Sequence, residues 1–275
     1  MSERLPNNSK RNTVIGVLIA IGISTLGIQA SDYIEYGTSS FLASLGDRSA
    51  CPEHSVLLTI DGQPLCVDVF EASAASVCPF SEPRSAADNT ANIQTTDCRP
   101  VSAPEVQPLR FTTYTHAEQF CARAGKRLPT PREWHVLARD VAVDPENCVV
   151  RGGLQETGSA DCVSGAGVHD LVGNVWEWVD AEIVDGRYNG RAVPPSGYVH
   201  GVDTAGVVLE TGEEPDPLYD GAYAWTSNEG VHGMVRGGFY GSGDDAGRYA
   251  QNLSVSLDTA TAGIGFRCVM DARGL

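Results

Sequence analysis

The stretch DLVGNVWEWV, residues 170–179, decides the fold of this chain. In an extended strand successive side chains point to opposite faces, so Trp176 and Trp178 share one face and Glu177 points to the other. Each indole can remove roughly 150–250 Å² of ring surface from water, which predicts a core strand. A carboxylate in such a strand is costly unless it is paired or bound to a metal ion, and one of the two is expected at Glu177.

Length, composition and charge limit the possible classes of protein. The chain has 275 residues, 42% of them hydrophobic, which is enough to bury a sizeable core in one large domain. It carries 19 Lys and Arg against 35 Asp and Glu, a net charge of −16. A surface of this sign repels phosphate backbones, so we expect no nucleic-acid partner. The same charge favours bound cations, although a soluble surface is its simpler interpretation.

The N-terminus indicates export. A few basic residues precede an uncharged apolar run at positions 14–28, the pattern of a secretory signal. The run is short for a membrane span, which needs about 20 apolar residues, but an uncleaved anchor stays open. Residues 1–30 are therefore predicted to be a signal peptide or N-terminal membrane anchor, 31–50 a linker, and 51–275 the folded domain. The domain would lie in the periplasm, outside the cell or on its outer surface, with the N-terminal segment its only membrane contact.

The cysteine count agrees with an oxidising compartment. An even number of cysteines in an exported chain indicates disulfides, although the sequence alone does not fix their pairing. No Cys-x-x-Cys pattern or Cys/His cluster suggests zinc. The eight cysteines are Cys51, Cys66, Cys78, Cys98, Cys121, Cys148, Cys162 and Cys268.

A hairpin and a loop are expected at the start of the domain. Two β-rich runs flank the Asp-Gly pair at positions 61–62, the signal of a β-hairpin over residues 55–70. Cys51 and Cys66 could close this hairpin. Residues 79–108 are rich in Ser, Pro, Ala and Asn and predict a loop, which a bond between Cys78 and Cys98 would staple.

Two helices have clear start signals. The pattern from Thr115 to Glu118 is a capping box, and Gly125 would end that helix. The pattern from Thr130 to Glu133 is a second capping box with a proline at the first helical position, where its missing N–H is not needed.

Four motifs occur in order: GKRLPTPREW at 125–134, GNVWEW at 173–178, VRGG at 235–238 and GFRC at 265–268. Together they resemble the formylglycine-generating enzyme, or sulfatase-modifying factor, family over roughly residues 51–271. The resemblance implies an α+β fold of the complex C-type-lectin kind, with little regular secondary structure, short antiparallel strands and two main helices.

The resemblance also implies one disulfide. Relatives pair a cysteine of the first helix with the cysteine of GFRC, here Cys121 and Cys268. A crosslink across so long a loop gives the largest stabilisation on the chain-entropy account. Among the remaining cysteines, Cys148 and Cys162 would close the loop ahead of the 170–179 stretch.

A calcium site is implied around GNVWEW. Relatives hold calcium through a polar side chain before the motif, carbonyls within it and its glutamate, which correspond to Asp170, Gly173, Val175 and Glu177. Calcium takes six to eight oxygen ligands, so this set suits it. The alternative is that Glu177 only accepts backbone N–H bonds. Asn174 is better interpreted as a turn residue that tolerates positive φ.

The family's catalytic position differs in this chain. Relatives bind copper(I) through two cysteines shortly after RGG and use it to oxidise a substrate cysteine to formylglycine. Here Ser242 stands at the first position, and Gly247, with one residue of slippage, stands near the second. Copper(I) selects soft thiolates, which hydroxyls do not replace, so copper is not expected and a catalytic pair is absent.

The same loop suggests a binding surface. Its glycines allow tight turns that could cradle a ligand. The side chains that could line a groove for peptide or sugar are Tyr240, Ser242, Asp244, Asp245, Arg248 and Tyr249. The long insertion at 180–230 predicts a surface loop of the kind that carries recognition.

The sequence thus favours an exported, non-catalytic domain of the sulfatase-modifying-factor kind that binds a protein or glycan partner. The alternative function is a formylglycine-generating oxidase that converts a sulfatase cysteine to formylglycine.

Overall fold

The computed structural model describes residues 51–142 and 146–272. The predictions for residues 1–30, a signal peptide or anchor, and for the linker at 31–50 lie outside these ranges. None of the helices in the two ranges combines the length and hydropathy needed to cross a bilayer.

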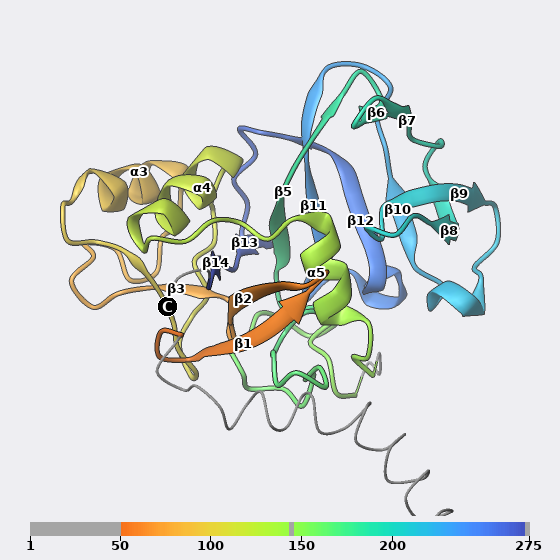
Figure 1. The fold of residues 1–275 in the computed structure, drawn as a ribbon. Coiled ribbons are helices and arrows are strands. Elements are labelled where there is room, and N and C mark those ends of the chain that lie inside the picture. Colours follow the sequence, from red (N-terminus) through yellow and green to blue (C-terminus); the bar gives the residue numbers. More distant parts are fainter. Residues whose placement is uncertain (1–50, 143–145, 273–275) are drawn as a thin grey trace, which may run out of the picture. The chain divides into compact units, whose positions relative to one another are not determined.

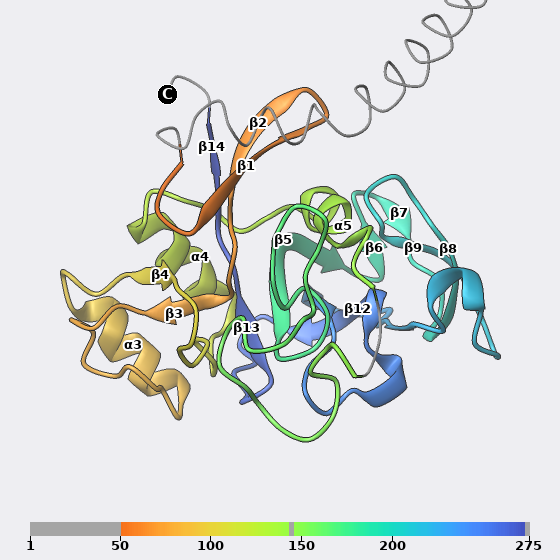
Figure 2. The same cartoon turned by 90° about the horizontal axis from the view of Figure 1, so that it is seen from below.

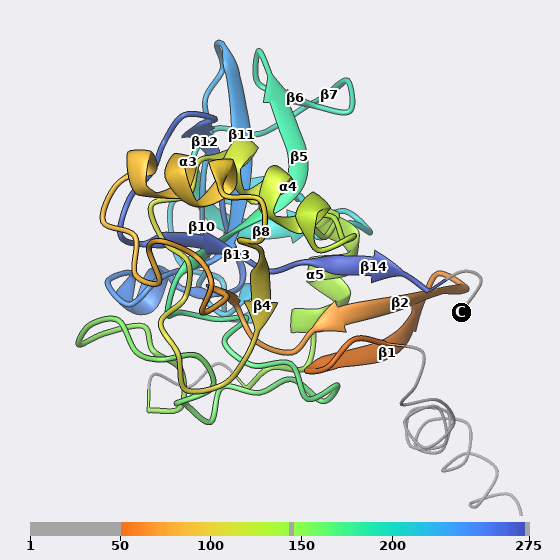
Figure 3. The same cartoon turned by 90° about the vertical axis from the view of Figure 1, so that its left-hand side faces the viewer.

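A small three-stranded sheet begins the domain (Figure 1). Strands β1 (Ser55–Ile60) and β2 (Gln63–Asp68) form the predicted antiparallel hairpin, and β14 (Val269–Asp271) pairs with the other edge of β2. Both residues of the connecting turn have positive φ, 50° for Asp61 and 76° for Gly62, which an Asp-Gly pair supplies at low cost. The two ends of the domain therefore meet in one sheet, and Figure 3 shows β14 lying along β2.

The segment predicted as a loop at 79–108 contains regular structure. Helix α3 (Ala86–Gln94) lies between the short paired strands β3 (Ala72–Ala74) and β4 (Pro100–Ser102). The buried residue Asn89 donates through Nδ2 to the carbonyls of Arg110 and Phe111 at 2.8 and 2.9 Å. Because this helix is anchored by buried amides, its sequence lacks the apolar periodicity that would have predicted it.

The two predicted helices are present, with one correction. Helix α4 (Tyr114–Arg123) starts earlier than expected, because the hydroxyl of Thr113 accepts from the backbone N–H of His116 at 3.1 Å. The capping box predicted at Thr115 is therefore wrong, since Thr115 lies inside the helix. Helix α5 (Pro131–Ala138) has the predicted capping box with both reciprocal bonds.

A nine-stranded sheet forms the rest of the domain. Its strand order is β7-β6-β5-β11-β12-β10-β8-β9, and β13 pairs in parallel with β5. Figures 1 and 2 show α3 and α4 together at one end of the domain and the β8–β9 hairpin at the other. The strands are β5 (Trp176–Val184), β6 (Arg187–Tyr188), β7 (Arg191–Ala192), β8 (Gly197–Val202), β9 (Val208–Gly212), β10 (Tyr223–Trp225), β11 (Val231–Gly237), β12 (Gly247–Ser256) and β13 (Ile264–Phe266).

The sheet curls until its ends approach each other. Arg191 in the edge strand β7 donates to the carbonyl of Val208 in the opposite edge strand β9 at 3.0 Å, and it pairs with Asp203 at 3.0 Å. The insertion at 180–230, predicted as a surface loop, thus supplies several strands of this sheet. Most of these strands are too short to show a period in the sequence.

Strand β5 is the predicted core strand. It is buried on both faces from Trp176 to Val179 and then alternates between exposed and buried from Asp180 onward. Trp178 is fully buried and donates through its indole N–H to the carbonyl of Thr112 at 2.9 Å. The first half of the strand therefore lies in the core, while the second half presents one face to solvent.

Glu177 has a cationic side-chain partner in the core. Arg267 donates through Nε to both carboxylate oxygens of Glu177 at 2.9 Å and through Nη2 to Oε1 at 2.6 Å. Neither side chain has measurable exposure, and the indole N–H of Trp134 donates to the same carboxylate at 2.8 Å. The remaining Arg267 donors bond the backbone carbonyls of Asp68, Val69 and His169.

We expect the substitution Arg267→Leu to lower the free energy of unfolding by about 3–5 kcal/mol, because it leaves the Glu177 carboxylate buried without its cationic partner. Urea denaturation followed by circular dichroism measures the loss. The matched control is Arg151→Leu, which removes a solvent-exposed pair with Asp244 and should leave the midpoint nearly unchanged. Equal midpoints for the two variants would contradict the assignment.

Candidate functional site

The predicted calcium residues lie at the start of β5. Asp170 is buried with φ 59°, and its carboxylate accepts from the backbone N–H of Gly158 at 2.6 Å. Gly173 has φ 84°, and an added Cβ there would lie 2.5 Å from the carbonyl oxygen of Val149. Asn174 has the positive φ predicted for it, 53°. The backbone of the turn therefore favours residue types that tolerate positive φ at these positions.

Sequence analysis missed Glu71, which belongs to the same cluster. Its fully buried carboxylate accepts from Asn174 Nδ2 at 2.6 Å and from the backbone N–H of Val175 at 3.2 Å. Burial, followed by repulsion from Asp170 and Glu177, raises the pKa of Glu71 well above its ordinary value. The available signal was the acid Glu71 inside the otherwise apolar run VFEA at 69–72.

The charges of this cluster do not balance. Glu71, Asp170 and Glu177 are three carboxylates, and Arg267 is the guanidinium that faces them. Burial also raises the pKa of Asp170, to about 6. When all four side chains are ionised, the cluster carries excess negative charge. Carboxylate oxygens are hard ligands, and a hard divalent cation such as calcium would balance this charge.

The net charge of the cluster suits calcium, but the arrangement of its oxygen atoms suits calcium less well. The Glu177 carboxylate is already bonded to Arg267 and Trp134, so of the predicted set Asp170 retains the less heavily bonded carboxylate. Within residues 51–142 and 146–272, no group of three or more His, Cys, Asp or Glu side chains is arranged to hold a metal ion.

The loop in which the resemblance predicts the family's copper position joins β11 to β12. Ser242 accepts through its hydroxyl from the backbone N–H of Phe239 at 3.0 Å, and the backbone N–H of Gly243 donates to the carbonyl of Val150 at 2.9 Å. The RGG glycines are needed for close approach, since a Cβ on Gly237 would lie 2.4 Å from the carbonyl oxygen of Leu171. Gly247 is buried as the first residue of β12.

All eight cysteines are paired, in the four combinations expected from the sequence and the resemblance. The disulfides are Cys51–Cys66, Cys78–Cys98, Cys121–Cys268 and Cys148–Cys162. Because every cysteine of the chain lies within the described residues, no thiol from another segment is available to the loop around Ser242.

The six residues predicted to line one groove do not lie together in one groove. Tyr240 lines a cleft together with Phe239, whose ring centroid lies 5.1 Å away. Arg248 instead forms a bidentate pair with Asp220, with bonds of 2.6 and 2.8 Å. Tyr249 packs against Tyr219, with ring centroids 5.2 Å apart.

The acids and the serine of that loop have local partners. Asp244 pairs with Arg151 at 2.5 Å on the exposed surface, and burial followed by repulsion from Asp244 raises the pKa of Asp245. The Ser242 hydroxyl accepts a bond within its own loop. None of these three residues lines the cleft that holds Tyr240.

The cleft around Tyr240 has a volume of about 690 Å³ and no charged side chain in its lining. Its walls combine aromatic and apolar groups with hydroxyl and amide groups. The lining residues are Trp176, Val235, Phe239, Tyr240, Asn252, Ser254, Val255, Ser256, Thr259, Thr261, Ala262, Gly263 and Ile264. We call it the neutral cleft. The sequence did not predict its hydroxyl residues as part of a site, because Ser and Thr near a turn are typical of solvent-exposed loops.

Comparison with known proteins agrees with this architecture. The model of the "Sulfatase-modifying factor enzyme 1-like domain" family matches residues 152–272. The formylglycine-generating enzyme of Mycobacterium tuberculosis (strain ATCC 25618 / H37Rv) is 28% identical over 192 residues, 60% of this chain. The chain spans 57% of the length of that relative.

Solved structures with a similar fold are more distant. PvdO from Pseudomonas aeruginosa is 16% identical with a TM-score of 0.44, covering 79% of this chain and 90% of that one. CarF is 14% identical with a TM-score of 0.40, covering 78% and 92%. The P3c variant of the Major Tropism Determinant is 17% identical with a TM-score of 0.43, covering 80% and 53%.

The short paired strands, the helices and the family match agree with the expected α+β fold of the sulfatase-modifying-factor kind, which four disulfides cross-link. Residues 152–272 thus match the sulfatase-modifying factor family, and the chain is similar to a formylglycine-generating enzyme.

Proposed function

We propose that this chain is an exported, non-oxidising member of the sulfatase-modifying factor family that binds a protein or glycan partner. The proposal rests on the resemblance, which implies that Ser242 and Gly247 fall at the copper-cysteine positions of relatives, and on the observation that all eight cysteines form disulfides. Copper(I) requires soft donors, and the hydroxyl of Ser242 is a hard one. The four disulfides also support an oxidising compartment outside the cytoplasm.

The absence of oxidase activity can be tested directly. We expect the purified protein, incubated with a Cys-x-Pro-x-Arg peptide, copper and oxygen, to produce no formylglycine by mass spectrometry. A formylglycine-generating enzyme of known activity serves as the positive control. Turnover by the wild-type chain would establish the alternative function, a formylglycine-generating oxidase.

A double variant tests whether the missing sulfurs are the cause. A Cβ on Gly247 would lie 3.7 Å from the Cβ of Ala222, an ordinary contact, so Ser242→Cys with Gly247→Cys should fold. We expect this variant to bind copper(I) in a chelator competition assay in which the wild type shows none. Copper(I) bound equally by both proteins would refute the proposed reason for inactivity.

The neutral cleft is the best-supported position for the ligand. Concave sites with apolar walls and a few convergent polar groups are typical ligand sites. The cleft has no ionic side chain although the chain carries a net charge of −16, so it suits an uncharged peptide segment or sugar. Trp176, Phe239 and Tyr240 offer aromatic faces for packing, and Asn252 and Ser254 offer hydrogen bonds.

Binding in this cleft can be measured with a glycan array and a random-peptide phage library as probes. We expect Tyr240→Ala to weaken the best wild-type ligand by at least about tenfold, the loss typical of an aromatic anchor. Tyr198→Ala is the matched control, because Tyr198 lies outside the cleft and packs on Tyr223. A ligand that binds both variants with wild-type affinity would place the binding site elsewhere.

We further infer that a calcium ion bound near Asp170, with Glu71 and the carbonyls of Gly173 and Val175, balances the buried negative charge. The excess of carboxylates over Arg267 supports this inference. Bound calcium would supply structural charge neutralisation and no redox chemistry, since it has one stable oxidation state. Asp170 and Glu71 are the side chains through which this chain would hold it.

Calcium is expected to raise the thermal midpoint relative to a sample in EGTA. At a calcium concentration one hundred times its Kd the gain is about 2.7 kcal/mol, and a protein of this size gains about 2–4 °C per kcal/mol. Asp170→Asn should abolish the difference, whereas the control Asp161→Asn, which neutralises a nearby exposed acid, should retain it. The inference fails if calcium leaves the wild-type midpoint unchanged.

A further inference from the structure

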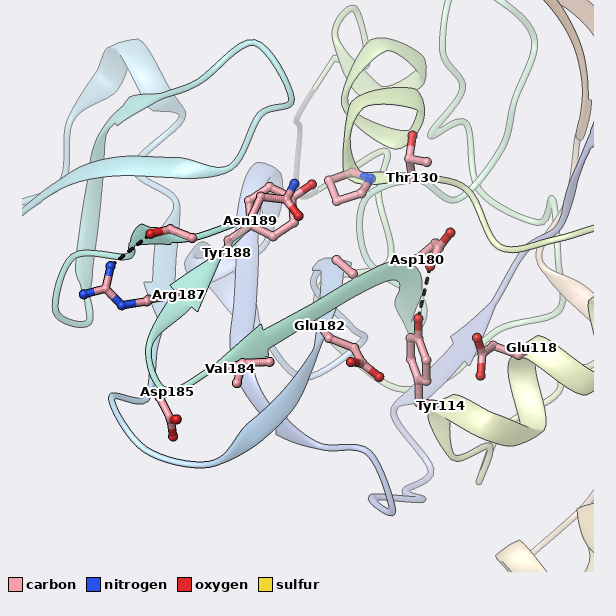
Figure 4. A pocket seen from close by; sticks show the side chains of 13 residues that line it. Tyr114, Glu118, Thr130, Asp180, Glu182, Val184, Asp185, Arg187, Tyr188 and Asn189 are labelled. Atoms are coloured by element: carbon pink, nitrogen blue, oxygen red, sulfur yellow. Dashed lines mark hydrogen bonds between the residues drawn. The ribbon is translucent and has the colours of Figure 1, made fainter.

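A second cleft, of about 880 Å³, lies on the opposite part of β5 from the neutral cleft. It is enclosed by the N-terminal parts of α4 and α5, the outer half of β5 and the β6 turn (Figure 4). The two clefts have no lining residue in common. We call this one the acidic cleft.

Three carboxylates converge on one wall of the acidic cleft. Asp180 and Glu182 project from the exposed face of β5, and Glu118 projects from α4 beside Tyr114. Asp180 accepts from the Tyr114 hydroxyl at 3.3 Å. None of the ion pairs formed by the described residues involves these three acids.

The one cationic side chain in the lining does not neutralise them. Arg187 donates to the carbonyl of Gly190 at 2.9 Å, and Figure 4 shows it turned away from Glu118 and Glu182. Partial burial, followed by repulsion from Asp180 and Glu182, raises the pKa of Glu118. A cation entering the cleft would relieve this repulsion.

The rest of the lining suits an organic cation better than a metal ion. Tyr114 and Tyr188 are aromatic, and Val184 is an apolar residue with 46% of its surface exposed. A guanidinium packs on aromatic faces and forms forked hydrogen bonds with carboxylates. The three acids do not form a metal-binding group among the described residues.

We propose that the acidic cleft docks a segment of a partner protein that presents an arginine side chain. The guanidinium would pair with Glu118 and Glu182, while its alkyl stem packs along Val184 and Tyr188. The net charge of −16 would speed the encounter with a basic partner. This docking surface is independent of the ligand proposed for the neutral cleft.

The proposal is tested by fluorescence anisotropy with a fluorescein-labelled peptide, Gly-Ser-Arg-Gly-Arg-Ser-Gly, and its citrulline counterpart, titrated with the full chain. Glu118→Gln with Glu182→Gln removes two charges from the cleft and keeps its shape. The matched control is Glu210→Gln with Glu213→Gln, which removes the same charge from exposed positions outside the cleft. Circular dichroism confirms that each variant is folded.

We expect the arginine peptide to bind the wild type and the control pair alike, and the cleft pair about fivefold more weakly or worse, the size expected for two partly exposed charge pairs. The citrulline peptide should not bind, and added salt should weaken the arginine peptide. Equal weakening by both pairs would show a diffuse field effect and overturn the proposal. Failure of the arginine peptide to bind the wild type, or citrulline binding of equal affinity, would also overturn it.

Discussion

The structure depends on the ion pair between Glu177 and Arg267. Both side chains are fully buried, and every polar atom they present is bonded. The pair joins the central strand β5 to the segment before β14, to the small sheet through the carbonyls of Asp68 and Val69, and to α5 through Trp134. A buried pair of this kind specifies one arrangement, because any other packing would leave a charge without a partner.

This constraint explains why three of the motifs occur together. The tryptophan of GKRLPTPREW, the glutamate of GNVWEW and the arginine of GFRC are three parts of one hydrogen-bonded unit. The presence of these three motifs in the sequence therefore indicates the fold. The loop between β11 and β12, where the resemblance implies the family's copper position, is separate from this unit and carries Ser242 and Gly247.

The two clefts follow from the two halves of β5. The first half is buried on both faces and contributes Trp176 to the neutral cleft. The second half has one exposed face, from which Asp180 and Glu182 enter the acidic cleft. Because one strand supplies both, the two clefts share one rigid element, which positions side chains more accurately than a loop does.

The sequence by itself determined the local turn and helix-capping motifs, and together with the family resemblance it indicated the cysteine pairing. The Asp61–Gly62 turn and the capping box of α5 follow from short-range hydrogen bonding and backbone preference, and the four disulfides follow from spacing and family resemblance. Only the tertiary structure decided that Arg267 is the partner of Glu177, that Glu71 joins the cluster, and that Tyr240 is separated from Arg248 and Tyr249. Such contacts join residues tens to hundreds of positions apart, so no local period or propensity encodes them. They are set by how buried charges and rings are satisfied once the whole chain has packed.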